Sequence, residues 1–180
     1  MLLLVDNGSI YTKNITNFLS TKKIPFTLLS YDNISSEDLD RFQSFILSGR
    51  RKNIKEMNAI NSKIINHCIL KNKSLLGICY GAEILALTLG GTIRKMQTAQ
   101  KGNSKILTTH ENLICSGTLE VYQSHNFEIS KLGKLFTQVA KSALSNYEII
   151  QYGNYRIFGT QFHPEMTQDG LVLIEKFLLL

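Results

Sequence analysis

The sequence of 180 residues has no tryptophan, only two prolines and only three cysteines. The cysteines form no C-x-x-C pair, and their odd number argues against a disulfide framework. We therefore expect the protein to work in a reducing cytoplasm. Internal repeats, low-complexity stretches and Pro/Ser-rich linkers are missing as well. The length suits a single domain with a sizeable core, so we expect residues 1–180 to form one domain.

Long apolar runs are also missing. The apolar start, residues 1–5, ends at Asp6 and is too short for a signal or membrane segment, since a span needs about 20 apolar residues. The net charge is +6, but Lys and Arg are scattered, with one short cluster at Arg50–Lys52. The four histidines lack the spacing of metal ligands. We therefore expect no membrane partner, no nucleic-acid partner and no metal.

The first half of the chain alternates between β-like and helical patterns. Short apolar runs at 2–5, 26–29, 45–47 and 74–78 predict strands. Helical periodicity predicts helices from Ile10 to Leu19, over 35–41 with Ser36 as a cap, over 57–70, and from residue 80 to about 89. This alternation is typical of an α/β fold with an open, mostly parallel central sheet and helices on both faces.

Beyond Gly90–Gly91 the pattern changes to shorter runs. The segments 92–94, 105–108, 119–123, 148–152 and 156–162 read as strands broken by turns, and 171–180 as a closing helix. We therefore expect a smaller antiparallel β part beside the parallel sheet. Ligands bind at the carboxyl ends of parallel strands. Asp6–Ser9, Ser48–Arg51 and Cys79 follow three such ends and are expected to converge on one site.

Cys79 lies between a predicted strand and a predicted helix. Gly77 and Gly81 flank it as G-x-C-x-G, the cysteine form of a nucleophile elbow. An elbow holds its central side chain out at the edge of the sheet, and the helix N-terminus favours a thiolate. The alternative is a buried structural cysteine.

A second group of reactive side chains occurs at His163-Pro164-Glu165, where another predicted strand ends. Pro164 biases His163 towards extended geometry, in which residues i and i+2 face the same side. His163 and Glu165 can then be neighbours, as a general base and the carboxylate that orients it. With a thiol they would form a Cys-His-acid triad. The alternative is a partly buried histidine and a solvated glutamate.

Three separated motifs now resemble the class I (triad) glutamine amidotransferase family. Residues 77–81 resemble its G-I-C-x-G elbow, residues 159–165 its G-x-Q-F-H-P-E segment, and Ser48-Gly49 ends a strand where the family has a glycine-rich oxyanion loop. The resemblance covers essentially the whole chain. It implies a flavodoxin-like fold, no cofactor, and hydrolysis of glutamine to glutamate and ammonia.

The resemblance also implies roles for individual residues. Cys79 would form a glutamyl thioester, His163 would transfer protons and Glu165 would orient His163. The backbone N–H groups of Tyr80 and of the loop at Gly49 would hold the oxyanion. A family loop that binds the backbone groups of glutamine is matched by Ser124, His125, Asn126 and Phe127, and a further contact to glutamine by Glu83. Ammonia would pass to an ATP-dependent synthetase, expected on a separate chain because 180 residues leave no room for it.

Within the family, residues 6–12, D-N-G-S-I-Y-T, are most similar to the D-x-G-x-Q-Y-T signature of the GMP synthase branch. That branch implies GMP synthesis from XMP. The anthranilate and aminodeoxychorismate synthase branch, with D-N-Y-D-S-F-T, is the alternative. Two departures leave other options open: Arg50 follows Gly49 where the family has small residues, and Glu83 replaces a glutamine. A weakly active or regulatory member of the fold, or a stand-alone γ-glutamyl hydrolase, is therefore also considered.

Overall fold

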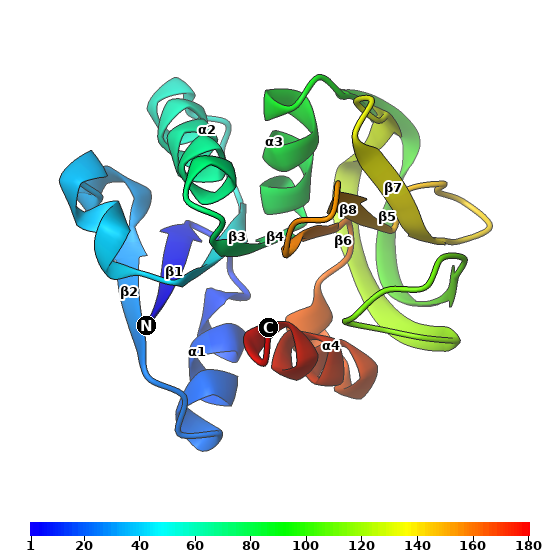
Figure 1. Ribbon diagram of the computed structural model, residues 1–180. Coiled ribbons are helices and arrows are strands. Elements are labelled where there is room, and N and C mark those ends of the chain that lie inside the picture. Colours follow the sequence, from blue (N-terminus) through cyan, green and yellow to red (C-terminus); the bar gives the residue numbers. More distant parts are fainter.

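A curled sheet runs through the middle of the molecule, with helices on both of its faces (Figure 1). This computed structural model describes the whole chain apart from the side chains of residues 36 and 37. The parallel part of the sheet consists of β1 (Leu2–Asn7), β2 (Phe26–Ser30), β3 (Ser44–Arg50), β4 (Ser74–Ile78) and β9 (Ile157–Thr160). The antiparallel part consists of β5 (Thr92–Thr108), β6 (Thr118–Lys131), β7 (Phe136–Lys141) and β8 (Ile149–Tyr152).

The described residues join these strands into one sheet with the order β2-β1-β3-β4-β9-β8-β7-β5-β6. The strands from β2 to β9 pair in parallel, and those from β9 to β6 pair antiparallel. The β6 edge curls back, because the backbone of Tyr122 bridges that of His163, just beyond β9. The expected α/β fold with a parallel and an antiparallel part is confirmed, although the antiparallel strands hold more residues than the parallel ones.

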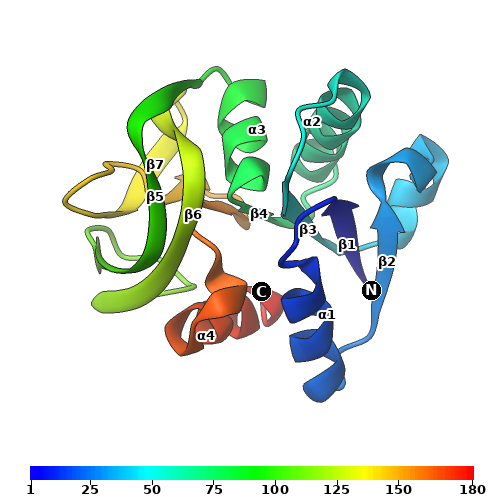
Figure 2. The ribbon, with the colours of Figure 1, turned by 180° about the vertical axis from the view of Figure 1, so that it is seen from behind.

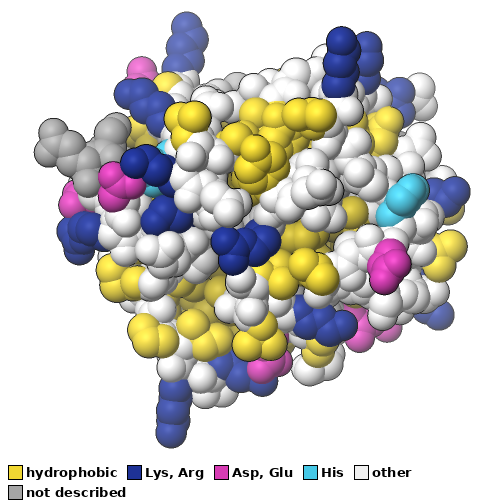
Figure 3. Space-filling view, viewed as in Figure 1, with side chains coloured by type: hydrophobic (Ala, Val, Ile, Leu, Met, Phe, Trp, Pro, Cys, Tyr) yellow, Lys and Arg dark blue, Asp and Glu magenta, His cyan; other side chains and the backbone are white. Residues whose placement is uncertain are grey.

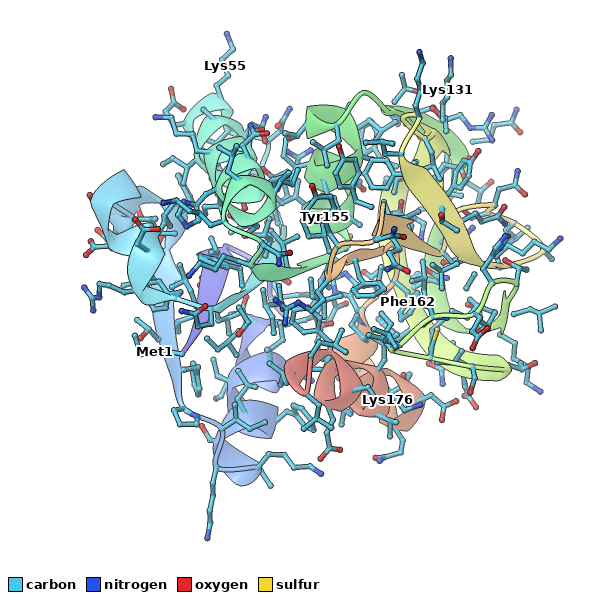
Figure 4. The ribbon with its side chains drawn as sticks, viewed as in Figure 1. Met1, Lys55, Lys131, Tyr155, Phe162 and Lys176 are labelled. Carbon is cyan, nitrogen blue, oxygen red and sulfur yellow. The ribbon has the colours of Figure 1, made fainter. Side chains whose placement is uncertain are left out.

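Helices α1 (Thr12–Thr21) and α4 (Gln168–Leu178) cover one face, and α2 (Lys55–Leu70) and α3 (Tyr80–Thr88) cover the other (Figures 1 and 2). A parallel strand covered on both faces contributes alternate side chains to two cores. In β1, Leu2 and Leu4 face the α1/α4 core, while Leu3 and Val5 face the α2/α3 core. Phe162 lies buried in the first core, next to α4 (Figure 4).

Several predicted elements differ from the structure. Helix α1 begins at Thr12, and Ile10 is 59% exposed rather than on the buried face. The segment predicted as a helix over 35–41 is a 3-10 helix, η2 (Ser36–Arg41), which follows η1 (Tyr31–Asn33). The predicted cap, the side chain of Ser36, lies outside the described residues.

The antiparallel part holds the largest differences. The runs 92–94 and 105–108 belong to a single strand, β5, and 119–123 is part of β6, which is also much longer than predicted. The pairing of β5 with β6 is irregular between Lys95 and Gln100. The sequence pattern of a strand is therefore interrupted there, and β5 was read as two runs. Strand β7 was not predicted, and the last helix, α4, begins three residues earlier, at Gln168.

The charged surface agrees with the scattered pattern of the sequence. On the face shown in Figure 3, Lys and Arg side chains are spread over many elements rather than gathered in one stripe. Lys55 and Lys131 extend away from the molecule (Figure 4). Within the described part of the chain, no helix combines the length and the apolar character needed to cross a membrane.

Candidate active site

Cys79 occupies the sharp turn between β4 and α3, with φ 51° and ψ −103°. Positive φ is strained for a residue with a side chain, and such strain persists only where the surroundings enforce it. The flanking glycines are required for this turn. A Cβ added at Gly77 would lie 2.4 Å from the carbonyl oxygen of Gly81, and one added at Gly81 would lie 2.4 Å from that of Leu47. The predicted elbow geometry is confirmed.

His163 lies just beyond the end of β9, the strand that neighbours β4. The backbone N–H of Cys79 donates to the carbonyl of Thr160 at 2.7 Å and ties the two strand ends together. The N–H of His163 donates to the carbonyl of Tyr122 on β6 at 2.8 Å. Backbone hydrogen bonds from two directions therefore place His163 beside the elbow.

His163 and Glu165 form a buried hydrogen-bonded pair. The distance from His163 Nδ1 to Glu165 Oε1 is 2.8 Å, and the two residues are 3% and 4% exposed. The local geometry differs from the extended segment that we expected, because Pro164 begins a 3-10 turn, η3 (Pro164–Met166). The turn, rather than strand alternation, brings the carboxylate back to the ring. Nδ1 is occupied, so Nε2 is the nitrogen that remains for proton transfer.

The predicted convergence of strand ends is confirmed at Gly49. A Cβ added at Gly49 would lie 3.1 Å from His163 Cε1 and 3.3 Å from Ser9 Oγ. Gly49 lies within β3 rather than in a loop after it, and Arg50 still forms a bridge to Gly8. A side chain at position 49 would therefore crowd the imidazole of His163, which would have to shift by a few tenths of an ångström.

Burial raises the pKa of the Cys79 thiol well above its usual range. The charges of Glu83 and Glu165 raise it further, while the backbone N–H of Tyr80 and the charge of Arg50 act in the opposite sense. The N–H of Tyr80, at the start of α3, thus acts in favour of the thiolate as expected, but burial outweighs it. Desolvation outweighs the helix dipole because the thiol is almost completely enclosed.

Glu83 lies one helical turn after Cys79 and is 5% exposed. Its Oε1 accepts a hydrogen bond from Gln161 Nε2 at 3.3 Å, and Gln161 Oε1 accepts one from the backbone of Ile129 at 3.2 Å. Burial raises the pKa of Glu83, against the opposing effects of the Gln161 hydrogen bond and the charges of Arg50 and His163. Glu83 is thus anchored beside the elbow instead of being free in solvent.

We expect Glu83→Gln to move the pH dependence of Cys79 alkylation by iodoacetamide to lower pH. The substitution removes a negative charge near the thiol and keeps an acceptor for Gln161. The thiolate then forms at lower pH, so the rate near neutral pH rises. Mass spectrometry of the Cys79 peptide measures this rate. Glu175→Gln is the matched control, because Glu175 pairs with Lys22 on the surface. An unchanged pH profile of alkylation in Glu83→Gln would contradict the inference that the charge of Glu83 raises the pKa of Cys79.

The segment Ser124–Phe127 is part of strand β6, not a loop as we expected. Ser124 Oγ accepts a hydrogen bond from the hydroxyl of Tyr11 at 3.3 Å. The ring of Tyr11 in turn lies edge-on to that of His163, with 4.5 Å between centroids. Ser124 is therefore linked to the catalytic histidine candidate through Tyr11. Asn126 is exposed, and Phe127 is 39% exposed.

His125 points into the antiparallel half of the sheet. Its Nε2 contacts Gln123 Oε1 at 2.9 Å and its Nδ1 contacts the carbonyl of Phe127 at 2.7 Å, and burial lowers its pKa. Gln123 Nε2 donates to the buried Glu148 at 3.0 Å. The side chain of Gln123 also lines a cavity of about 690 Å³ that is formed mainly by β5. Neither Cys79 nor His163 lines this cavity. The hydrogen bonds of His125 to Gln123, and of Gln123 to Glu148, form an internal polar network.

Four residues of the site were missed by the sequence analysis. Tyr11 and Gln161 lie inside quoted motifs but were given no role, and they contact His163 and Glu83. Asn53 and Asn58 hydrogen-bond to Arg50, and Asn58 also accepts from Tyr80. The asparagines carry no sequence signal, because their partners lie on other elements.

Metal-ligating side chains do not gather in the described part of the chain: no group of three or more His, Cys, Asp or Glu residues is placed to hold an ion. The reactive groups at the elbow are a thiol, an imidazole and a carboxylate, with backbone N–H groups nearby. Tyr80 is the first residue of α3, so its N–H has no partner within the helix. This arrangement suits nucleophilic attack on a carbonyl carbon.

The family model described as Glutamine amidotransferase class-I matches residues 3–179. The chain belongs to this family. Among curated relatives of this amidotransferase, a glutamine-hydrolysing GMP synthase subunit of Thermoplasma acidophilum is 31% identical over 98% of this chain and 90% of its own length. Glutamine-hydrolysing GMP synthase of Helicobacter pylori is 32% identical over 100% of this chain but only 36% of its own length. The chain thus spans about a third of the longer relatives.

Solved structures give the same assignment. A putative GMP synthase subunit from Thermoplasma acidophilum superposes on the amidotransferase chain with a TM-score of 0.87 at 30% identity, covering 98% of this chain and 91% of that one. A glutamine amidotransferase from Thermotoga maritima has a TM-score of 0.79 at 20% identity over 98% and 81% of the two chains, which shows a shared fold. The predicted family is confirmed.

Proposed function

We propose that the protein is a glutaminase that hydrolyses glutamine through Cys79, His163 and Glu165 and supplies ammonia to a synthetase. One observation carries this proposal: the buried His163–Glu165 pair lies beside a cysteine held in a strained elbow. Strained backbone at a nucleophile is typical of a functional constraint. Membership of the class I glutamine amidotransferase family supports the same chemistry.

In the first step, Cys79 Sγ attacks the side-chain amide carbon of glutamine, and its proton moves to His163 Nε2. Because burial raises the pKa of the thiol, little thiolate exists beforehand and the proton moves as the bond forms. Glu165 accepts the Nδ1–H of the imidazolium and stabilises its charge. The N–H of Tyr80 and one from the Gly49 segment hold the oxyanion.

In the second step, the C–N bond breaks and His163 returns its proton to the leaving amine, which departs as ammonia. A γ-glutamyl thioester remains on Cys79. Water then attacks the thioester carbon and gives a proton to His163, and the C–S bond breaks. Glutamate leaves, and the proton returns to the thiol, so that the enzyme is regenerated.

Glutamine binding is proposed to involve Glu83 and the β6 segment Ser124–Phe127. Glu83 lies one turn along α3 from the nucleophile, where its carboxyl group can meet the ammonium group of the substrate. Ser124, Asn126 and Phe127 offer backbone groups on the strand next to His163. The side chain of His125 is committed to Gln123 and Phe127, so we propose that it supports this strand rather than contacting glutamine.

The names of the relatives point to GMP synthesis. We propose that residues 1–180 act as one amidotransferase domain in the cytoplasm and that ammonia goes to an ATP-dependent synthetase on a separate chain, which converts XMP to GMP. The D-N-G-S-I-Y-T segment supports this branch over the anthranilate and aminodeoxychorismate branch. In the structure it is anchored by Asp6, whose carboxylate accepts from Gly8 N and Thr12 Oγ1, both at 2.9 Å.

The test combines the purified protein with the XMP-aminating synthetase of the same organism, ATP, magnesium and XMP. GMP formation is measured with glutamine and, separately, with an ammonium salt, which bypasses the amidotransferase. We expect glutamine to support GMP formation only when both proteins are present. If the ammonium salt yields GMP and glutamine does not, the proposal is wrong. Turnover of γ-glutamyl peptides in preference to glutamine supports a stand-alone hydrolase instead.

A further inference from the structure

Arg50 is the bulky cation that follows Gly49, and its side chain lies across the elbow. The guanidinium carbon lies 4.2 Å from the centroid of the Tyr80 ring. Its Nη1 donates to Asn53 Oδ1 at 2.6 Å and to Asn58 Oδ1 at 3.2 Å. A planar cation that stacks on a ring and donates in its own plane is held in one orientation. The guanidinium of Arg50 is therefore fixed in place beside α3.

The two asparagines close this group into a network. Tyr80 donates its hydroxyl hydrogen to Asn58 Oδ1 at 2.7 Å, and Asn58 Nδ2 donates to Asn53 Oδ1 at 3.0 Å. Arg50 ends β3, Asn53 lies between β3 and α2, Asn58 is on α2 and Tyr80 begins α3. Helices α2 and α3 lie side by side in both views (Figures 1 and 2). The network thus connects the end of β3 to the start of α3 through α2.

The residues that the network connects carry the backbone of the proposed oxyanion hole. Tyr80 directly follows Cys79, and Arg50 directly follows Gly49. One donor is at the start of a helix and the other at the end of a strand, so their spacing depends on what joins the two elements. A hydrogen-bond donor stabilises an oxyanion only at the correct distance from the developing charge.

We propose that Arg50 is a positioning residue, which stacks on Tyr80 and binds Asn53 and Asn58 so that the two oxyanion donors keep a fixed spacing. The inference rests on the proposed glutaminase function. It gives a role to Arg50, which stands where the family has small residues. We call Arg50 and its partners Tyr80, Asn53 and Asn58 the clamp. The same four residues, together with Glu83, line a cavity of about 90 Å³.

Arg50→Met and Arg50→Lys test the clamp. Both keep a long side chain, but neither stacks and donates as a planar fork does. We expect Arg50→Met to lower kcat for glutamine by about 10- to 100-fold, since misplacement near 1 Å costs roughly 10²-fold, with KM changed less. Arg50→Lys keeps the charge and is expected to stay impaired. Tyr80→Phe, which loses only the hydroxyl bond to Asn58, is expected to lose several-fold less activity than Arg50→Met.

The rate of Cys79 alkylation by iodoacetamide separates positioning from general damage, because that reaction forms no oxyanion. It should remain within a few-fold of the wild-type rate in Arg50→Lys, which keeps the charge. Arg50→Met is compared at the high-pH limit of its alkylation profile, because loss of the Arg50 charge raises the pKa of the Cys79 thiol. The matched control is Arg41→Met, because Arg41 lies over Phe42, 5.8 Å from the ring centroid, and pairs with Asp38 on the surface. This control should leave kcat unchanged.

All variants are assayed as full chains with the synthetase present, alongside wild type. Wild-type kcat in Arg50→Met, full activity in Arg50→Lys, or alkylation that falls in parallel with kcat each overturns the clamp while leaving the glutaminase function intact. If Arg50→Met does not fold, Arg50→Lys and Tyr80→Phe decide: unchanged kcat in both overturns the clamp. A wild-type protein that hydrolyses no glutamine with its synthetase overturns the proposed function itself, and the clamp with it.

Discussion

Cys79→Ala is expected to lower the rate of glutamine hydrolysis by at least about 10⁵-fold, because losing a nucleophile removes the covalent route altogether. What remains is substrate binding and oxyanion stabilisation without a bond-forming sulfur. Release of ammonia and glutamate, measured with and without the synthetase, checks this. The thermal unfolding midpoint of the variant should stay close to that of wild type, since the substitution deletes one sulfur atom from a site that is 8% exposed.

Cys115→Ala is the matched control for this prediction. Cys115 is also buried, but its thiol contacts Asn112 and Thr108, outside the residues assigned to the elbow. We expect its glutaminase rate to remain within about twofold of wild type, as for substitutions remote from the chemistry. Equal rates in Cys79→Ala and wild type would show that Cys79 is a structural cysteine and that the elbow has no catalytic role.

Glu165→Gln is expected to lower kcat by about 10³- to 10⁴-fold. The carboxylate accepts the Nδ1–H of His163 and thereby leaves Nε2 free to take the thiol proton. An amide can turn its NH₂ group towards Nδ1, which selects the opposite tautomer and also removes the negative charge that stabilises the imidazolium. Because both residues are buried, water does not replace the lost contact.

Steady-state kinetics over a range of pH tests the role of Glu165. The loss should fall on kcat, with little change in KM, because the proposed role of Glu165 is to orient His163, which it contacts at 2.8 Å. Glu120→Gln is a suitable control, as Glu120 is an exposed residue whose carboxylate accepts from Asn103 on the neighbouring strand. A decrease of less than about tenfold in Glu165→Gln would mean that another group orients the imidazole.

The parallel half of the fold could be predicted from the sequence because its strands are buried on both faces. Residues 2–5 of β1 and 75–78 of β4 are short runs without a polar side chain, and the elbow follows from two glycines at fixed spacing around Cys79. Glycine is required at both positions, because an added Cβ would clash with backbone atoms, and a change of side-chain rotamer cannot remove such a clash. Local sequence signals agree here with the tertiary structure, so the prediction is accurate.

The antiparallel half was harder to predict because its regularity is tertiary. β5 and β6 pair over most of their lengths, but the irregularity between Lys95 and Gln100 disrupts the alternation of side chains. The segment Ser124–Phe127 has polar residues typical of a loop, yet it is held as a strand by pairing with β5. Cross-strand hydrogen bonds, which the local sequence does not encode, decide these elements.

The site shows the same division. The His163–Glu165 contact was predicted, but for an extended segment rather than the 3-10 turn that makes it. The helix N-terminus that favours a Cys79 thiolate was visible in the sequence, whereas the burial and the charges of Glu83 and Glu165 that outweigh it were not. Arg50 stood out as a departure, but its stacking on Tyr80 depends on residues distant in the chain.

The most direct test of the account is to locate the covalent intermediate. Wild-type protein is mixed with glutamine and its synthetase, quenched rapidly in acid and digested, and the peptides are analysed by mass spectrometry for a γ-glutamyl thioester. We expect the γ-glutamyl adduct on Cys79, with a larger fraction of the protein modified when the reaction is quenched before one turnover is complete. We expect no adduct in Cys79→Ala. Glutamine hydrolysis with an adduct on Cys68 or Cys115, or with hydrolysis undiminished in Cys79→Ala, would contradict it.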